Sequence, residues 1–283
     1  MGIGFSVVSP QQPRRLIWVP VEGTDTLYQG NIVYYGLRTP ANTGGVKPLL
    51  VASGMGDVAK FQPPFGVVVG DNNATPLYKT LTTALIKMPY ITGVDTAADQ
   101  LARDGRGAEG MYAKGDPQPM VLVEQVTPET VLRGYFRNSA TVGTTVITTL
   151  SPTAVATTAM TFATFGMSPV ADNATTYCVK GANAGLYRVS TNTSATAYAY
   201  TREWPYTPAT TDTFKCVNVR QGLCRMDLDT TYGLWIDNTA ALTSNCYLVN
   251  VLKLDLSGGA GEEYCDFSFA HDMFSAAPQG RTT

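Results

Sequence analysis

Charge and histidine are scarce in this sequence, and so are the patterns that charged partners require. Only 15% of the residues are charged, the net charge is −2 and there is a single histidine. A nucleic-acid surface needs a basic stripe and an anionic lipid surface needs a polybasic segment. Neither is present, so we predict no direct contact with nucleic acid and none with a membrane. No apolar run approaches the roughly 18 residues of a membrane-spanning helix.

Cysteine patterns are equally sparse. Five cysteines occur, none in a C-x-x-C pair, which excludes the usual zinc spacings and makes a disulfide framework improbable in a chain of this size. Arg14 and Arg15 follow the N-terminal apolar stretch, the reverse of a secretory signal. We therefore predict synthesis in a reducing cytoplasm, with the cysteines buried as small hydrophobic residues.

Groups that could catalyse a reaction are few. The one histidine, His271, lies in "SFAHDMF" without a G-x-S-x-G motif elsewhere. Glu262 and Glu263 are adjacent, so a strand would point them to opposite faces. Asp227 and Asp229, two apart on one strand face, could join a calcium site, but EF-hand spacing is absent. We predict that the protein is not an enzyme and has no cofactor or metal.

Threonine, serine and asparagine take the place of charge, and period-two patterns run through much of the chain. Extended runs are predicted at 26–37, 47–53, 65–73 and 119–127. Near the C-terminus, "LKLDLSGGAGEEYCDFSF" predicts a hairpin whose dry face carries Leu252, Leu254 and Leu256 on one arm. Residues 185–208 predict two further extended runs that flank residues 191–194.

One segment favours another structure. In "TPLYKTLTTALIKM", residues 75–88, the leucines follow helical spacing, although the threonines favour a strand. Taken together, the patterns predict a mainly β fold of antiparallel sandwich or barrel domains with at most one or two short helices. We predict an extended N-terminal arm over 1–23, a β-rich domain over 24–137 and a C-terminal sandwich or barrel over 138–283.

Two sets of apolar side chains are candidate binding residues. The arm is too apolar for a free tail, and its candidates are Phe5, Val7, Val8, Leu16, Ile17 and Trp18. The alternative is that the arm pairs as an edge strand of its own domain. The second set, Tyr198, Tyr200, Trp204 and Tyr206, could form an aromatic interface patch or a sugar-stacking platform, or could be core residues.

Three stretches resemble the capsid decoration, or cement, proteins of tailed bacteriophages. They are "PPFGVVVGDNNATP", "GLYRVSTNTSATAYAYTREWPYTPATTDTFKCVNVRQGL" and "LKLDLSGGAGEEYCDFSF". The resemblance implies a structural virion protein on the capsid exterior, a homo-oligomer (trimer or dimer) that binds the major capsid protein and stabilises its lattice. It implies no catalytic or contact residues. Other virion roles, in the tail tube or as a minor head protein, and a carbohydrate-binding β-sandwich remain alternatives.

The arm gives the first testable prediction. If residues 1–23 anchor the protein, removing them should leave a folded protein that binds capsids more weakly, because prolines lower the ordering cost of such an arm. Co-sedimentation with capsids measures this, and unchanged affinity of the truncated protein would contradict it.

Overall fold

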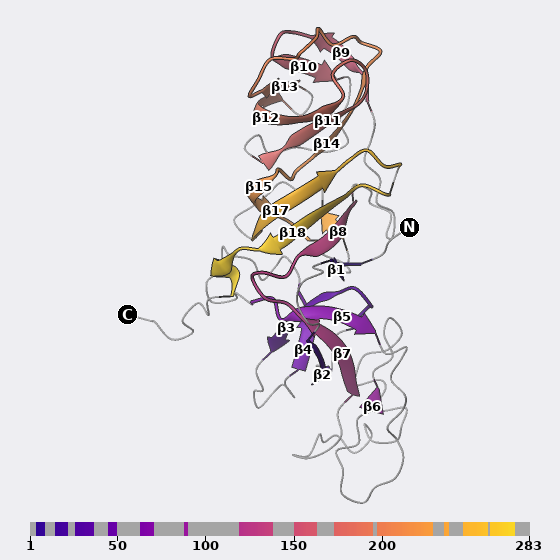
Figure 1. The fold of residues 1–283 in the computed structure, drawn as a ribbon, viewed down its shortest axis with the longest axis vertical. Helices are drawn as coiled ribbons and strands as arrows, with labels where there is room; N and C mark the ends of the chain where they lie inside the picture. Colours follow the sequence, from indigo (N-terminus) through magenta and orange to yellow (C-terminus); the bar gives the residue numbers. More distant parts are fainter. Residues whose placement is uncertain are drawn as a thin grey trace, which may run out of the picture.

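Strands that pair mostly antiparallel make up the regular structure, as the sequence predicts. The computed structural model describes residues 4–8, 15–21, 26–36, 45–49, 63–70, 88–89, 119–137, 150–162, 173–194, 197–228, 235–237, 246–259 and 261–274. These residues form three sheets that follow one another along the longest axis of the molecule (Figure 1). The one short helical element that we describe is a 3-10 turn, η4 (His271–Met273). The predicted mainly β fold is confirmed.

The N-terminal sheet has the strand order β2-β7-β5-β3-β4, with β6 beside β7. Its strands are β2 (Leu16–Pro20), β3 (Ile32–Gly36), β4 (Gly45–Pro48), β5 (Gly66–Gly70), β6 (Met88–Pro89) and β7 (Pro119–Gln125). The sheet curls until Val21, just after β2, forms a bridge with Val46 of β4 at the opposite end. Its concave side holds a core that is largely valine, including Val33, Val68 and Val121.

The central sheet has the order β1-β8-β18-β17-β15, with β16 parallel to β8. Its strands are β1 (Ser6–Val7), β8 (Leu132–Arg137), β15 (Gly222–Met226), β16 (Ile236–Asp237), β17 (Tyr247–Asp255) and β18 (Tyr264–Phe269). They come from both sides of residue 138, so the predicted N-terminal and C-terminal parts share one sheet. Ile32 and Val67 of the N-terminal sheet pack in the same core.

The distal sheet lies between β8 and β15 in sequence and has the order β14-β11-β12-β13-β10-β9. Its strands are β9 (Pro152–Val155), β10 (Ala159–Phe162), β11 (Thr175–Lys180), β12 (Gly185–Ser194), β13 (Ala197–Tyr200) and β14 (Thr213–Val217). Leu150, just before β9, exchanges two backbone hydrogen bonds with Phe214 of β14, at 2.8 and 2.9 Å. This bridge brings the two ends of the sheet together around an aromatic core.

The C-terminal hairpin is confirmed, but the predicted burial of one of its leucines is wrong. β17 and β18 pair antiparallel, and Leu254 and Leu256 are buried as predicted. Leu252 is instead 52% exposed. The register shifts between Val251 and Lys253, so a β-bulge turns Leu252 to the wet face. A bulge shifts the residues after it to the opposite face of the sheet. A prediction that assumes an unbroken period of two therefore assigns Leu252 to the wrong face.

Two other sequence predictions meet the structure differently. Residues 191–194 do not separate two strands, because they are the end of β12 and pair with β13 through two register shifts. The possible helix at 75–88 lies outside the described residues, apart from Met88, which begins β6.

A buried ion pair joins the distal sheet to the central sheet. Lys215 of β14 places its Nζ 2.7 Å from Glu263 Oε1, next to β18, and donates a second hydrogen bond to the Gly258 carbonyl oxygen at 2.6 Å. The other carboxylate oxygen of Glu263 accepts a bond from the Gly261 N–H at 2.9 Å. Both charged side chains are almost fully buried. The pair therefore stabilises the fold only while both partners remain.

We expect Glu263→Ala to destabilise the protein by about 3–5 kcal/mol, because it leaves the Lys215 ammonium buried without its counter-ion. Urea unfolding measures the change. The exposed Lys253→Ala is the matched control and should have little effect. A Lys215→Met, Glu263→Leu double variant should recover most of the loss. A Glu263→Ala protein as stable as the control would show that the pair does not hold the sheets together.

Candidate functional site

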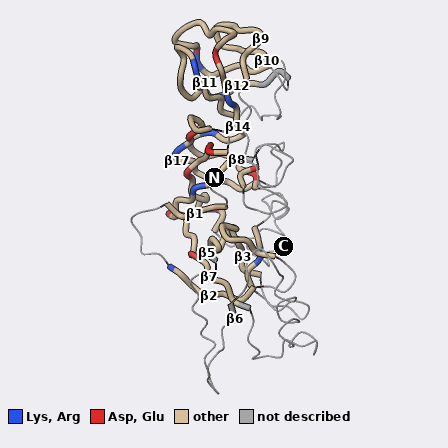
Figure 2. Tube along the Cα trace, turned by 90° about the vertical axis from the view of Figure 1, so that its right-hand side faces the viewer, with Lys and Arg blue, Asp and Glu red and all other residues tan. Residues whose placement is uncertain are grey.

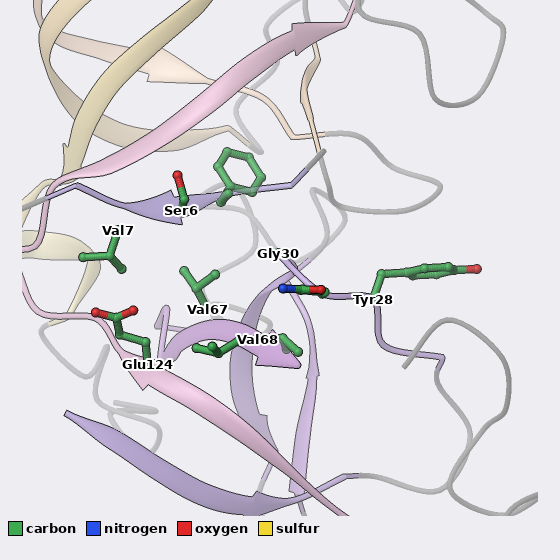
Figure 3. A pocket seen from close by; sticks show the side chains of 10 residues that line it. Ser6, Val7, Tyr28, Gly30, Val67, Val68 and Glu124 are labelled. Atoms are coloured by element: carbon green, nitrogen blue, oxygen red, sulfur yellow. The ribbon is translucent and has the colours of Figure 1, made fainter. Parts of the chain in front are cut away.

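A cavity of about 470 Å³ lies where β1 of the central sheet passes over the N-terminal sheet. Its walls are Phe5–Val7, the turn 28–30, Val67–Val69 of β5 and Glu124 of β7. In Figure 3, Val7, Val67 and Glu124 extend into the space between β1 and the N-terminal sheet, while the Tyr28 ring points away. The cavity is therefore mainly apolar with one carboxylate in its wall.

Two glycines allow the sheets to approach closely at this cavity. A Cβ on Gly30 would lie 2.6 Å from the Cα of Gly4, and a Cβ on Gly4 would lie 2.7 Å from the Cα of Gly30. Both have positive φ, +86° for Gly4 and +84° for Gly30, which favours glycine. The Phe5 N–H donates to the Gly30 carbonyl oxygen at 2.9 Å. The backbone itself thus sets the spacing of the two walls.

Phe5 fixes β1 to the central core. A Cβ atom added to Gly134 of β8 would lie 2.5 Å from the Phe5 ring. The centroids of the Phe5 and Phe267 rings are 6.0 Å apart, in an edge-to-face arrangement. Phe5 is buried with the other members of this core. Substituting Gly134 or truncating Phe5 would therefore disturb core packing as well as the cavity.

The structure places the arm candidates inside its own sheets. Phe5 is buried, Val7 and Val8 are half-buried, and β1 pairs with β8. Ile17 and Trp18 are half-buried and Leu16 is exposed in β2, which pairs with β7 along its whole length. For these residues the edge-strand alternative describes the arm, and deletion of 1–23 would remove core packing. We now expect that truncation to destabilise the protein, so point substitutions suit a binding test better.

The aromatic candidates are brought together, but in a core. Tyr198, Tyr200 and Trp204 are buried in the distal sheet, where the Trp204 ring centroid lies 3.9 Å from that of Tyr187 and 4.9 Å from that of Tyr200. These three rings are therefore core residues, one of the readings that the sequence left open.

Tyr206 alone of the four is exposed, at 64%. Its backbone is held by the buried Asn183 side chain, which donates to the Tyr206 carbonyl oxygen and accepts from its N–H, both at 2.9 Å. A carbohydrate-stacking surface would therefore depend on Tyr206 without the neighbouring rings.

Two buried aspartates face each other in the central core. Asp227 follows β15 and Asp237 ends β16; they are 4% and 7% exposed. The Leu228–Ile236 bridge and the bond from the Asp237 N–H to the Asp227 carbonyl oxygen, 2.9 Å, make them directly opposite positions. The sequence singled out Asp227 but paired it with Asp229, which lies outside the described residues. The position of Asp237 opposite Asp227 follows only from the register of the bridge between Leu228 and Ile236, which the sequence does not indicate.

Burial, with Asp237 as a second cause, raises the pKa of Asp227 to about 7. Its Oδ1 has no hydrogen-bond partner in the described structure. Arg137 is the register partner of Asp237 in β8, and Tyr247 of β17 lies near Asp227. A carboxyl group with this pKa is mainly neutral below about pH 7 and becomes ionised as the pH rises through that value.

The cysteine side chains are packed in the interior, whereas His271 lies at the surface. Burial raises the pKa of Cys178 to about 11 and that of Cys216 to about 12, and all five cysteines are buried free thiols. His271 is exposed in η4. In the described ranges, no group of three histidine, cysteine, aspartate or glutamate side chains could hold a metal ion.

Comparison with known proteins gives no relative: no family model, no curated protein and no solved structure matches this chain. Across the part of the chain that the structure describes, no helix is long and apolar enough to cross a membrane.

The aspartate pair predicts a pH dependence of stability. The folded-state pKa of Asp227 is raised above its unfolded value, so the folded state binds more protons between about pH 4 and pH 7, and stability falls as pH rises through that window. We expect the free energy of unfolding to drop by about 1–3 kcal/mol between pH 5 and pH 8 from this group.

Asp227→Asn should flatten this drop and stabilise the protein at pH 8, whereas the exposed control Asp272→Asn should keep it. Urea unfolding across this pH range measures both. A wild-type profile that is flat, or that rises with pH in the same way as the Asp227→Asn profile, would contradict the assignment.

Proposed function

We propose that this chain is a structural protein of a bacteriophage particle, which binds the outer surface of the major capsid lattice and stabilises it. The observation that supports this most is the serial arrangement of three β-sheets joined by buried contacts along one axis (Figure 1). Such a body presents a long surface built on paired strands, and a surface that is ordered before binding loses little conformational entropy on binding. The resemblance of three stretches to capsid decoration proteins supports the same class.

The charge distribution fits a partner recognised by shape and backbone contacts. In Figure 2, basic and acidic positions are spread along the described chain without a block of one sign. Some of the charges are paired within the molecule. Arg133, for example, holds Asp266 through two bonds of 2.8 and 2.9 Å. Association would therefore depend little on long-range electrostatic steering.

Repetition would supply the stabilising effect. On a symmetric lattice every copy presents the same surface, and a dimer or trimer joins neighbouring capsid subunits through several contacts at once. Contacts of modest strength then add through their high effective concentration. We propose the capsid exterior as the location and the major capsid protein as the partner; a tail-tube or minor head role is the alternative within the same class.

Purified protein mixed with undecorated shells of a tailed-phage major capsid protein from the same genome should co-sediment saturably, in proportion to shell surface. Bound shells should also resist heat disruption better than bare shells, because the added contacts cross subunit boundaries. The exposed-face variant Leu252→Ser is a control for non-specific apolar sticking. Recovery of the chain only with tails, or an absence of binding to intact shells, would contradict capsid decoration.

A further inference from the structure

β8 has β18 along one edge and two short strands along the other. β1 covers the start of this second edge and β16 covers its end. β16 consists of Ile236 and Asp237. On its other side, the Asp237 N–H donates to the Asp227 carbonyl oxygen at 2.9 Å, and Leu228 forms a bridge with Ile236. The end of the β8 edge is therefore covered only while this small element stays in place.

Two carboxyl groups meet where β16 is held. The register places the Asp227 and Asp237 side chains directly opposite each other, and residues in such positions have Cβ atoms about 4.5–5.5 Å apart. Both side chains are buried, so water screens their repulsion little. The Oδ1 atom of Asp227 has no hydrogen-bond partner in the described structure. Two ionised carboxylates in this arrangement would push β16 away from the chain after β15.

Three further elements bring titratable or charged residues to this place. Tyr247 of β17 is fully buried near Asp227, and Tyr34 of β3 lies near Tyr247. On β8, Arg137 occupies the register position beside Asp237. Tyrosine is neutral near pH 7, so the two tyrosines supply no positive charge to Asp227. Burial and the charge of Asp237 raise the pKa of Asp227 to about 7. The carboxyl group therefore changes its charge in the neutral range.

We propose that the Asp227–Asp237 pair is a pH-sensitive clasp, which holds β16 on β8 while Asp227 is protonated and loosens it when Asp227 is ionised. Loosening uncovers the peptide groups at the end of the β8 edge. Trp235 and Ile236 are fully buried, so loosening exposes apolar surface and the loosened form stays a minor state at every pH. The clasp goes beyond the proposed function and does not depend on a capsid partner.

The direction of the pH effect follows from proton binding. The closed form has the raised pKa of Asp227, whereas the loosened form hydrates the carboxyl group and returns its pKa toward about 4. The closed form therefore binds more protons between about pH 4 and pH 7, and the clasp weakens as the pH rises through that range. Because local opening needs less free energy than global unfolding, the effect should be measurable at β16 itself.

Hydrogen exchange, corrected for the intrinsic rate at each pH, measures the clasp. The Asp237 amide reports on β16. The Phe136 amide, which donates to the Glu263 carbonyl oxygen at 3.2 Å on the opposite edge of β8, is the internal control. We expect the Asp237 amide to be less protected than the Phe136 amide and to lose protection at least about tenfold between pH 5 and pH 8. Asp227→Asn should abolish this loss, and the exposed control Asp272→Asn should keep it.

Each alternative outcome overturns the clasp. Equal protection of the Asp237 and Phe136 amides would mean that β16 opens only when the whole protein unfolds. Protection of the Asp237 amide that does not change with pH, or a loss that Asp227→Asn retains, would also contradict it. If Asp227→Asn fails to fold, Asp237→Asn takes its place, because it removes the same repulsion.

Addition of calcium chloride at pH 8 tests a cation as the rival to the proton. Under the proposal, calcium leaves the protection of the Asp237 amide unchanged. Protection that calcium restores in the wild type, but not in Asp227→Asn, would mean that a bound cation neutralises the two carboxylates, and it would overturn the proton clasp.

Discussion

Unpaired peptide groups at strand edges are the constraint that shapes this molecule. Three sheets in one chain create several edges, and each exposed edge invites association with another strand. The chain covers them by different means: a backbone bridge at Leu150 and Phe214, another at Val21 and Val46, and the Asn173 side chain on β15. An asparagine amide carries a donor and an acceptor, so it can take the place of a peptide group. Asn183 does the same for Tyr206.

Buried contacts that join the sheets bring together residues distant in sequence. Lys215 reaches across to Glu263, and Phe5 reaches from the N-terminus into the space above Gly134. Because these contacts are buried, the sheets are held in a fixed order along the axis in Figure 1. Contacts between residues so far apart form only after long loops close, which makes folding slow and favours edges that are covered once folding is complete. Buried contacts such as that of Lys215 with Glu263 thus hold the sheets together, whereas Leu150, Val21 and Asn173 cover strand edges.

Local alternation predicted several of the strands, and in the C-terminal hairpin the structure differs where a single residue interrupts the alternation. The runs at 65–73 and 119–127 contain β5 and β7, and the hairpin at 252–269 forms. The alternation assigns Leu252 to the buried face, but a bulge inserts one residue and leaves its side chain exposed. The opposition of Asp227 and Asp237, and the contact of Phe5 with Gly134, depend on tertiary register. No periodicity within one segment carries that information.

For the same reason, little of the candidate site could be predicted from the sequence. Phe5 and Val7 attract attention as apolar residues in an arm, yet they differ in use: Phe5 fills the core, whereas the backbone of Val7 faces the cavity. A side-chain pattern cannot express this difference, because the groups concerned are an N–H and a C=O that every residue possesses. Only the register 6 with 133 and 8 with 131 shows which peptide group is directed outward. Peptide groups at a strand edge therefore leave little trace in residue types, and the register of the sheet is needed to tell which of them are directed outward.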